Sequence, residues 1–145
     1  METETMGRVL TEATIENLGD LWMVEQGVRT AEQVRRLVIP DALVDTGATF
    51  LSLPTRMIQQ LGLTPRYKKR FVSSNGTVSE ADVYSTVRLT IQDRDCPTDV
   101  IAVPDNVPPL VGQIPLEALD LVVDLRNRRL IGNPEHGGEH IIEMY

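Results

Sequence analysis

The segment over residues 42–53 holds one carboxylate in a setting that could support chemistry. Apolar residues precede Asp45, and the small turn Thr46-Gly47-Ala48 follows it. Gly47 lets the backbone approach closely, so that amide N–H groups can face the carboxylate, and the Thr46 hydroxyl adds a donor. Because apolar residues flank the turn on both sides, we expect Asp45 at the tip of a buried turn, where an unpaired charge would be costly.

Three other interpretations of Asp45 are open at this point. A β-turn that happens to begin with Asp is the simplest, since turns favour this residue. Asp41 could join Asp45 on a metal ion, although neither an EF-hand nor a facial-triad spacing accompanies the pair. An Asp nucleophile for phosphoryl transfer would need its usual second Asp two residues later, where Gly47 stands.

The flanking pattern and the order of elements carry a family resemblance. The apolar-Asp-Thr-Gly-Ala pattern resembles the active-site loop of aspartic proteases. A strand over residues 34–44, a hairpin tipped at Asn75-Gly76 and an apolar-apolar-Gly motif at Leu110-Val111-Gly112 before a helix extend the likeness over about residues 8–134. The chain is thus similar to the single-domain bacterial type of retropepsin-like aspartic protease. The resemblance implies an all-β fold, mostly β with one or two short helices, closed as an acid protease barrel in a homodimer.

The resemblance also implies a role for particular residues. Asp45 would be the catalytic carboxylate, with Thr46 locking the two loops across the dimer axis and Gly47 orienting the carboxylates. Each chain has a single Asp-Thr-Gly, so two subunits are needed to build one site. The substrate-binding residues would be Ala48, Thr49, Asn75, Gly76, Val111 and Gly112.

Two departures from the family pattern bear on activity. Thr49 and Gln113 stand where viral retropepsins commonly have an Asp and an Arg that grip substrate and brace the dimer, and Gly76 is the one glycine of the predicted flap. The function predicted is an aspartic endopeptidase that acts on a peptide or protein substrate. The alternative is a retropepsin-like dimerisation or peptide-binding module with little hydrolysis.

Composition narrows the classes of partner, cofactor and cellular location that we expect. The chain has 145 residues, a net charge of −7 and a pI near 4.8, which argues against nucleic acid or an anionic membrane as a partner. Cys96 is the single cysteine, and no signal peptide or membrane span is apparent, so we expect a cytoplasmic protein. His136 and His140 lack further ligands at suitable spacing, so we expect no metal site and no cofactor.

Other signals set the organisation of the chain. We expect a flexible leader over residues 1–7, one protease domain over residues 8–134 and a C-terminal tail over residues 135–145. Pro40-Asp41 should interrupt a strand, and Gly62 should end a helix over residues 55–61. The basic run over residues 66–70 is predicted to be a solvated strand edge. Trp22 is predicted to plug the core or an interface.

Overall fold

The computed structural model describes residues 8–73 and 75–144, so the predicted leader lies outside the described residues. The strands are β1 (Val9–Asn17), β2 (Arg36–Val44), β3 (Leu51–Pro54), β4 (Pro65–Val72), β5 (Val78–Ile91), β6 (Arg94–Val103), β7 (Leu110–Val111), β8 (Leu121–Asp124) and β9 (Arg129–Gly132). The helices are α2 (Leu18–Glu25), α3 (Thr55–Gln60) and α4 (Gln113–Leu119), with 3-10 turns η1 (Ala31–Gln33) and η2 (Pro134–His136). Within these residues, none of the helices has the length and apolarity needed to cross a membrane.

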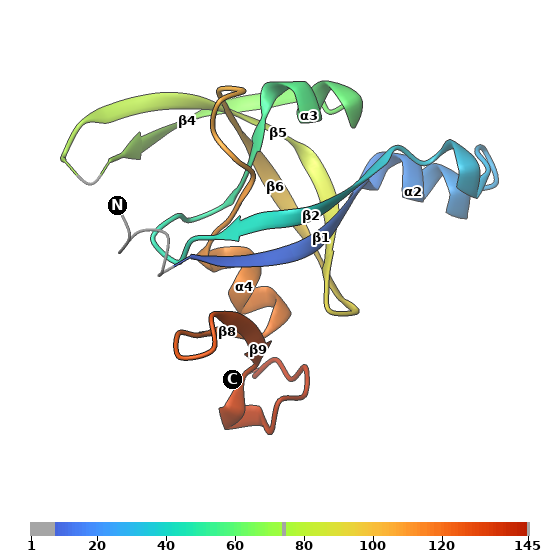
Figure 1. Ribbon diagram of the computed structural model, residues 1–145. Helices are drawn as coiled ribbons and strands as arrows, with labels where there is room; N and C mark the ends of the chain where they lie inside the picture. Colours follow the sequence, from blue (N-terminus) through green and yellow to red (C-terminus); the bar gives the residue numbers. More distant parts are fainter. Residues whose placement is uncertain (1–7, 74, 145) are drawn as a thin grey trace.

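A closed mixed sheet forms the body of the protein. Seven of the described strands pair in the order β1-β2-β7-β3-β6-β5-β4. The second half of β5 also pairs with β1, from Thr14↔Thr90 to Asn17↔Val87, and this pairing closes the sheet into a ring (Figure 1). The predicted all-β class and the implied barrel are confirmed.

Strand β7 occupies an unusual place in this sheet. It lies between β2 and β3, parallel to β2 (Val44↔Val111) and antiparallel to β3 (Leu51↔Val111). The loop that joins β2 to β3 must therefore pass over the end of β7. That loop contains Asp45.

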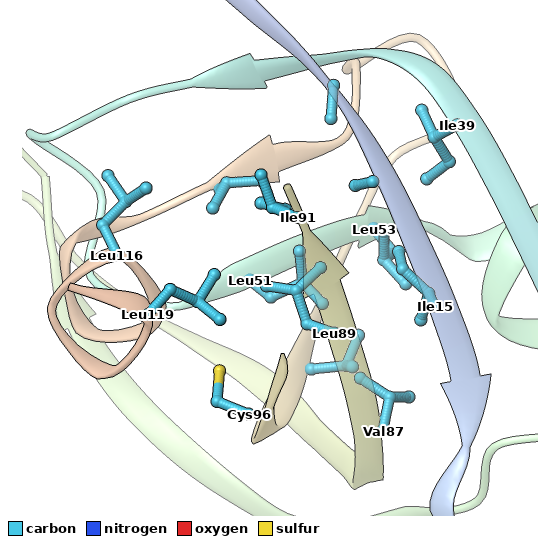
Figure 2. Close-up of a cluster of buried hydrophobic side chains, with 14 of the residues drawn as sticks. Ile15, Ile39, Leu51, Leu53, Val87, Leu89, Ile91, Cys96, Leu116 and Leu119 are labelled. Carbon is cyan, nitrogen blue, oxygen red and sulfur yellow. The ribbon is translucent and has the colours of Figure 1, made fainter. Parts of the chain in front are cut away.

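The core is aliphatic, as the low aromatic content indicates. Alternate residues of β5 point inward, and Val87, Leu89 and Ile91 are at most 1% exposed. Figure 2 shows them packed among side chains from β1, β2, β3 and α4, among them Ile15, Ile39, Leu51, Leu53, Leu116 and Leu119. Cys96 lies in the same cluster, and burial raises the pKa of its thiol to about 11, so the residue behaves as a small apolar side chain.

Two breaks in regular structure lie where the sequence indicates. The register between β1 and β2 shifts at Pro40 and Asp41, which lie opposite the single residue Glu12 in a β-bulge. Gly62 follows α3 with φ +65°, the left-handed conformation that ends a helix. Both predictions are confirmed.

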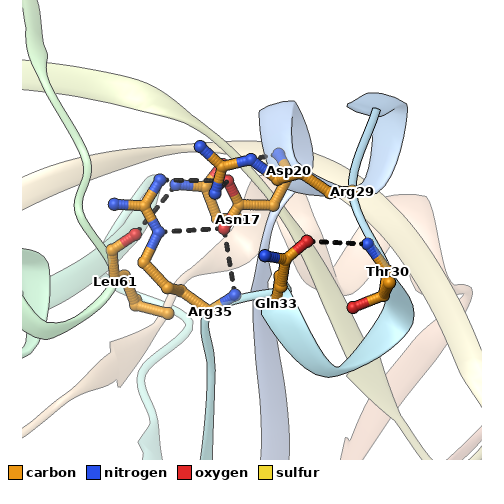
Figure 3. Close-up of polar contacts among 7 residues, drawn as sticks. All are labelled: Asn17, Asp20, Arg29, Thr30, Gln33, Arg35 and Leu61. Carbon is orange, nitrogen blue, oxygen red and sulfur yellow. Dashed lines mark hydrogen bonds and ion pairs between the residues drawn. The ribbon is translucent and has the colours of Figure 1, made fainter. Parts of the chain in front are cut away.

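Helix α2 is one short helix more than expected, and it projects from the barrel (Figure 1). Asn17 caps it by accepting the Asp20 N–H at 3.1 Å and ties it to the barrel by donating to the Leu61 carbonyl at 2.8 Å. The Asp20 carboxylate accepts two bonds of 2.9 Å from the Arg35 guanidinium (Figure 3), which holds the pKa of that carboxyl below its usual value. Trp22, on α2, is 57% exposed, so the prediction that it plugs the core is wrong; an interface role stays a prediction.

A long hairpin of β4 and β5 extends away from the barrel (Figure 1). In the turn between Val72 and Val78, Gly76 takes φ +84°, which the predicted Asn-Gly tip requires. Strand β4 ends the sheet order, and its basic residues 66 and 68–70 are exposed. The predicted solvated strand edge is confirmed.

Candidate active site

Asp45 lies immediately after β2, and hydrogen bonds fix its position. Its backbone N–H donates to the Val111 carbonyl at 3.0 Å, and its carbonyl accepts the Ala48 N–H at 3.0 Å. One carboxylate oxygen, Oδ1, accepts the Gly47 N–H at 2.9 Å. Within the part of the chain that the structure describes, Oδ2 accepts no hydrogen bond, so this oxygen is available to a water or a ligand.

The start of α4 supports the back of the loop. The N–H groups of residues 112–114 donate to the carbonyls of Phe50, Ala48 and Thr49 at 3.0, 2.8 and 2.9 Å. Helix α4 has no side-chain cap, so these loop carbonyls satisfy N–H groups that a helix start otherwise leaves unpaired. A Cβ at Gly112 would lie 2.5 Å from the Phe50 oxygen, so only glycine permits this approach.

The loop is open to solvent in the single chain. Asp45 is half-buried, and Thr46, Gly47 and Thr49 are exposed. The expectation of a buried turn is therefore wrong for one chain, because β2 and β3 bury the residues beside the loop and leave its tip uncovered. Another molecule would have to cover the loop to remove the Asp45 carboxylate from water.

A pocket of about 200 Å³ lies beside the loop. Residues 47–50 form one wall, and Phe71 and Val72 of β4 form another, with Ile101 of β6 in the lining. The rings of Phe50 and Phe71 meet edge to face, with centroids 6.1 Å apart. The end of the hairpin next to its turn thus packs directly on the Asp45 loop, and the pocket beside this contact can accept an apolar side chain.

Comparison of the sequence with known protein families identifies the family of this chain. A family model described as "Aspartyl protease" matches residues 35–115, which is more than half of the chain. This chain belongs to the aspartyl protease family. The matched segment contains the Asp45 loop, the hairpin and Gly112, which are the parts that build the site. A comparison with curated proteins found no match.

Not all of the residues assigned from the resemblance to aspartyl proteases come together. Asp45, Thr46, Gly47, Ala48 and Thr49 share one loop with Gly112 behind it. Val111 has no exposed surface in the single chain, and its carbonyl accepts the Asp45 N–H, so it supports the loop. Its role in substrate binding stays a prediction.

The hairpin contributes to the pocket through different residues from those predicted. Asn75 and Gly76 are exposed at the tip and do not line the pocket, whereas Phe71 and Val72 do. The sequence held one usable signal for these missed residues. Alternation along β4 places Phe71 on one face of the hairpin, but nothing local indicates that Phe50 is the residue it contacts.

The two departures from the aspartyl protease pattern have simple environments. The Gln113 side chain donates to Glu117 Oε1 at 3.0 Å, within its own helix, and Thr49 is exposed. Among the described residues, neither side chain forms a hydrogen bond to the loop, which is held mainly by backbone hydrogen bonds.

The histidines of the tail have structural contacts. His136 Nδ1 lies 2.6 Å from Asp120 Oδ2, and the Ile141 N–H donates to the same oxygen at 3.1 Å. The Asp120 hydrogen bond raises the pKa of His136 above its usual value. No group of three potential metal ligands occurs among residues 8–73 and 75–144.

Proposed function

We propose that this protein is an aspartic endopeptidase in which two Asp45 carboxylates, one from each subunit of a homodimer, activate a water that hydrolyses a peptide bond. The observation that carries the proposal is the state of Asp45 in one chain. It is held rigidly through its backbone and Oδ1, yet Oδ2 and the tip of the loop are uncovered. A two-fold interface would place the same residue of a second chain opposite it.

The chemistry requires two carboxylates with different protonation states. Two close carboxylates do not both ionise readily, so the pair holds one proton. The ionised Asp45 takes a proton from the water as its oxygen attacks the scissile carbonyl carbon, and the neutral Asp45 donates a hydrogen bond to the carbonyl oxygen. Collapse of the tetrahedral intermediate passes a proton to the leaving amine and restores the shared proton, without a covalent intermediate.

The pocket gives the substrate a place beside this pair. An extended peptide between the Asp45 loop and the hairpin would direct one apolar side chain toward Phe50 and Phe71. Movement of the hairpin tip at Asn75 and Gly76 would then cover the peptide and exclude water, as a lid does.

One observation favours the alternative, a dimerisation or peptide-binding module with little hydrolysis. Gln113 bonds to Glu117 in its own helix, so a cross-loop brace is absent from this position. Loose positioning of the two carboxylates would lower the rate, because misplacement by about 1 Å can cost about 10²-fold.

Cleavage of a peptide library distinguishes the endopeptidase from the binding module with little hydrolysis. We expect the wild-type protein to cleave, Asp45→Asn to be inactive because an amide cannot act as base, and Asp41→Asn, an exposed residue of β2, to keep the wild-type rate. A plot of the cleavage rate against pH should be bell-shaped between about pH 3 and 9, because turnover stops when the carboxylate pair holds either no proton or two protons. Cleavage by Asp45→Asn at the wild-type rate would exclude this residue as the catalytic group.

Subunit mixing tests the two-chain site directly. Excess Asp45→Asn added to a fixed amount of wild-type protein should lower total activity, since mixed dimers hold one carboxylate, while excess Asp41→Asn should not. Sedimentation over a concentration series gives the oligomeric state. An active protein that stays monomeric would contradict the proposal.

We also propose that the protein is located in the cytoplasm, and cell fractionation tests this location.

A further inference from the structure

The two faces of the β4–β5 hairpin differ in how their charges are balanced. On one face, Lys68 Nζ lies 3.7 Å from Asp82 Oδ1, and Arg70 lies opposite Glu80 in the strand register. Opposite charges that face each other across two strands stabilise a hairpin. The basic residues of this face are therefore matched by acidic residues of the hairpin itself.

Lys69 lies on the other face, which contacts the Asp45 loop. Its ammonium nitrogen is 5.3 Å from the centroid of the Phe50 ring, and Phe71, two residues along the strand, packs on the same ring. The residue opposite Lys69 is Ala81. Among the described residues Lys69 forms no salt bridge, so this face has a cation without a carboxylate.

The position of this cation relates it to the pocket. Phe50 lies in the pocket wall, and the ammonium is above its ring. In an extended peptide, side chains two residues apart lie on the same side and about 7 Å apart. A peptide with an apolar side chain in the pocket can therefore bring its next side chain on that side to Lys69.

We propose that Lys69 gives this site a preference for peptides that carry a carboxylate side chain two residues from the apolar residue held in the pocket that Phe50 and Phe71 line. The inference rests on the proposed function, because it requires a peptide between the Asp45 loop and the hairpin. The net charge of −7 would disfavour acidic peptides in general, so the preference is a local property of this cation.

Matched peptides test the preference. Each pair differs only in Glu or Gln at the second position on either side of a central Leu or Phe. Binding is measured by fluorescence anisotropy with the Asp45→Asn protein, which does not turn the peptide over, and cleavage is measured with the wild-type protein. We expect the Glu peptide to be favoured about two- to fivefold, the range of an exposed ion pair. The advantage should shrink in about 1 M salt, where charges are screened within about 3 Å.

Variants assign the effect to one side chain. Lys69→Gln should remove the preference and leave the Gln peptide nearly unchanged, Lys69→Arg should keep it, and Lys68→Gln on the opposite face should keep it. If Lys69→Gln weakens both peptides equally, Lys69 only holds the hairpin on Phe50, and the proposal is wrong. Persistence of the preference in Lys69→Gln, or absence of any peptide binding, would also overturn it.

The two assays separate the failure of each proposal. Equal cleavage of both peptides by the wild-type protein would refute the acidic preference and leave hydrolysis intact. A Lys69-dependent preference in binding without cleavage would refute hydrolysis and support the acidic selectivity of the site.

Discussion

The substitution Gly112→Ala tests whether the start of α4 positions the Asp45 loop. Gly112 has φ −91° and ψ −174°, a backbone conformation that alanine adopts without strain. The effect must therefore come from the new methyl group. It would lie 2.5 Å from the Phe50 oxygen and 2.7 Å from the Ala48 oxygen, and both distances are well below the 3.4 Å at which ordinary contact begins.

The magnitude follows from what must move. The neighbouring atoms are backbone, so the loop has to shift by several tenths of an ångström, which strains its three hydrogen bonds to residues 112–114. Overpacking costs about 1–3 kcal/mol, and each weakened bond adds up to about 1 kcal/mol. We expect a loss of about 2–4 kcal/mol in the free energy of unfolding. A displacement of about 1 Å can lower a catalytic rate by about 10²-fold, so this smaller shift of the loop should lower the rate by less than that.

The assay compares stability with activity against a matched control. Gly132→Ala also places a methyl group against backbone, the Gly138 carbonyl of the tail, away from the Asp45 loop. Both variants should lower the urea midpoint of unfolding, but only Gly112→Ala should lower kcat/KM in the absence of denaturant. A Gly112→Ala protein with the stability and kcat/KM of the wild type would refute the supporting role of this contact.

Three further predictions concern other parts of the chain. Thr46→Ala should weaken dimerisation by about 1–3 kcal/mol if the Thr46 hydroxyl crosses the interface and its loss leaves a partner group unpaired. Equal dimer dissociation constants by sedimentation would exclude a Thr46 contact between the two loops. Gly76→Pro should impair cleavage while the circular dichroism of the sheet persists, because φ +84° and the N–H bond to Ser73 are incompatible with proline; wild-type cleavage would show that the tip is not a lid. The raised pKa of His136 means that its charged contact with Asp120 stabilises the tail at low pH and is lost as the pH rises past that raised value. The protection of the Ile141 N–H against hydrogen exchange should therefore fall above pH 6.5 in the wild type and not in His136→Gln. Protection that does not depend on pH in the wild type would contradict this.

Local rules predict much of the fold from the sequence. Pro40-Asp41 marks a bulge because proline cannot donate within a strand, and Gly62 ends α3 because it adopts a positive φ readily. The Asp45-Thr46-Gly47 turn is likewise local, since Gly47 supplies the N–H that binds Oδ1. Each of these features depends on residues that are close in sequence.

The remaining features depend on contacts between residues that are distant in the sequence. Phe50 and Phe71 meet outside the core and line the pocket, and nothing near either residue in the sequence indicates this contact. Thr46 and Trp22 are exposed in the single chain, because the loop tip and helix α2 that carry them lie outside the core. Apolar character or apolar neighbours predict burial, but whether a residue is buried depends on the tertiary arrangement of the elements around it.

The insertion of β7 between β2 and β3 determines when the site can form during folding. Leu43 pairs with Leu110, so a long segment of chain must close before the loop gains its support. Closure of long loops is unfavourable in entropy, and such distant pairings form slowly. On the ribosome, Asp45 emerges long before residues 110–114. A nascent chain therefore holds the carboxylate without the backbone that orients it, and the site assembles only when nearly the whole matched segment has been synthesised.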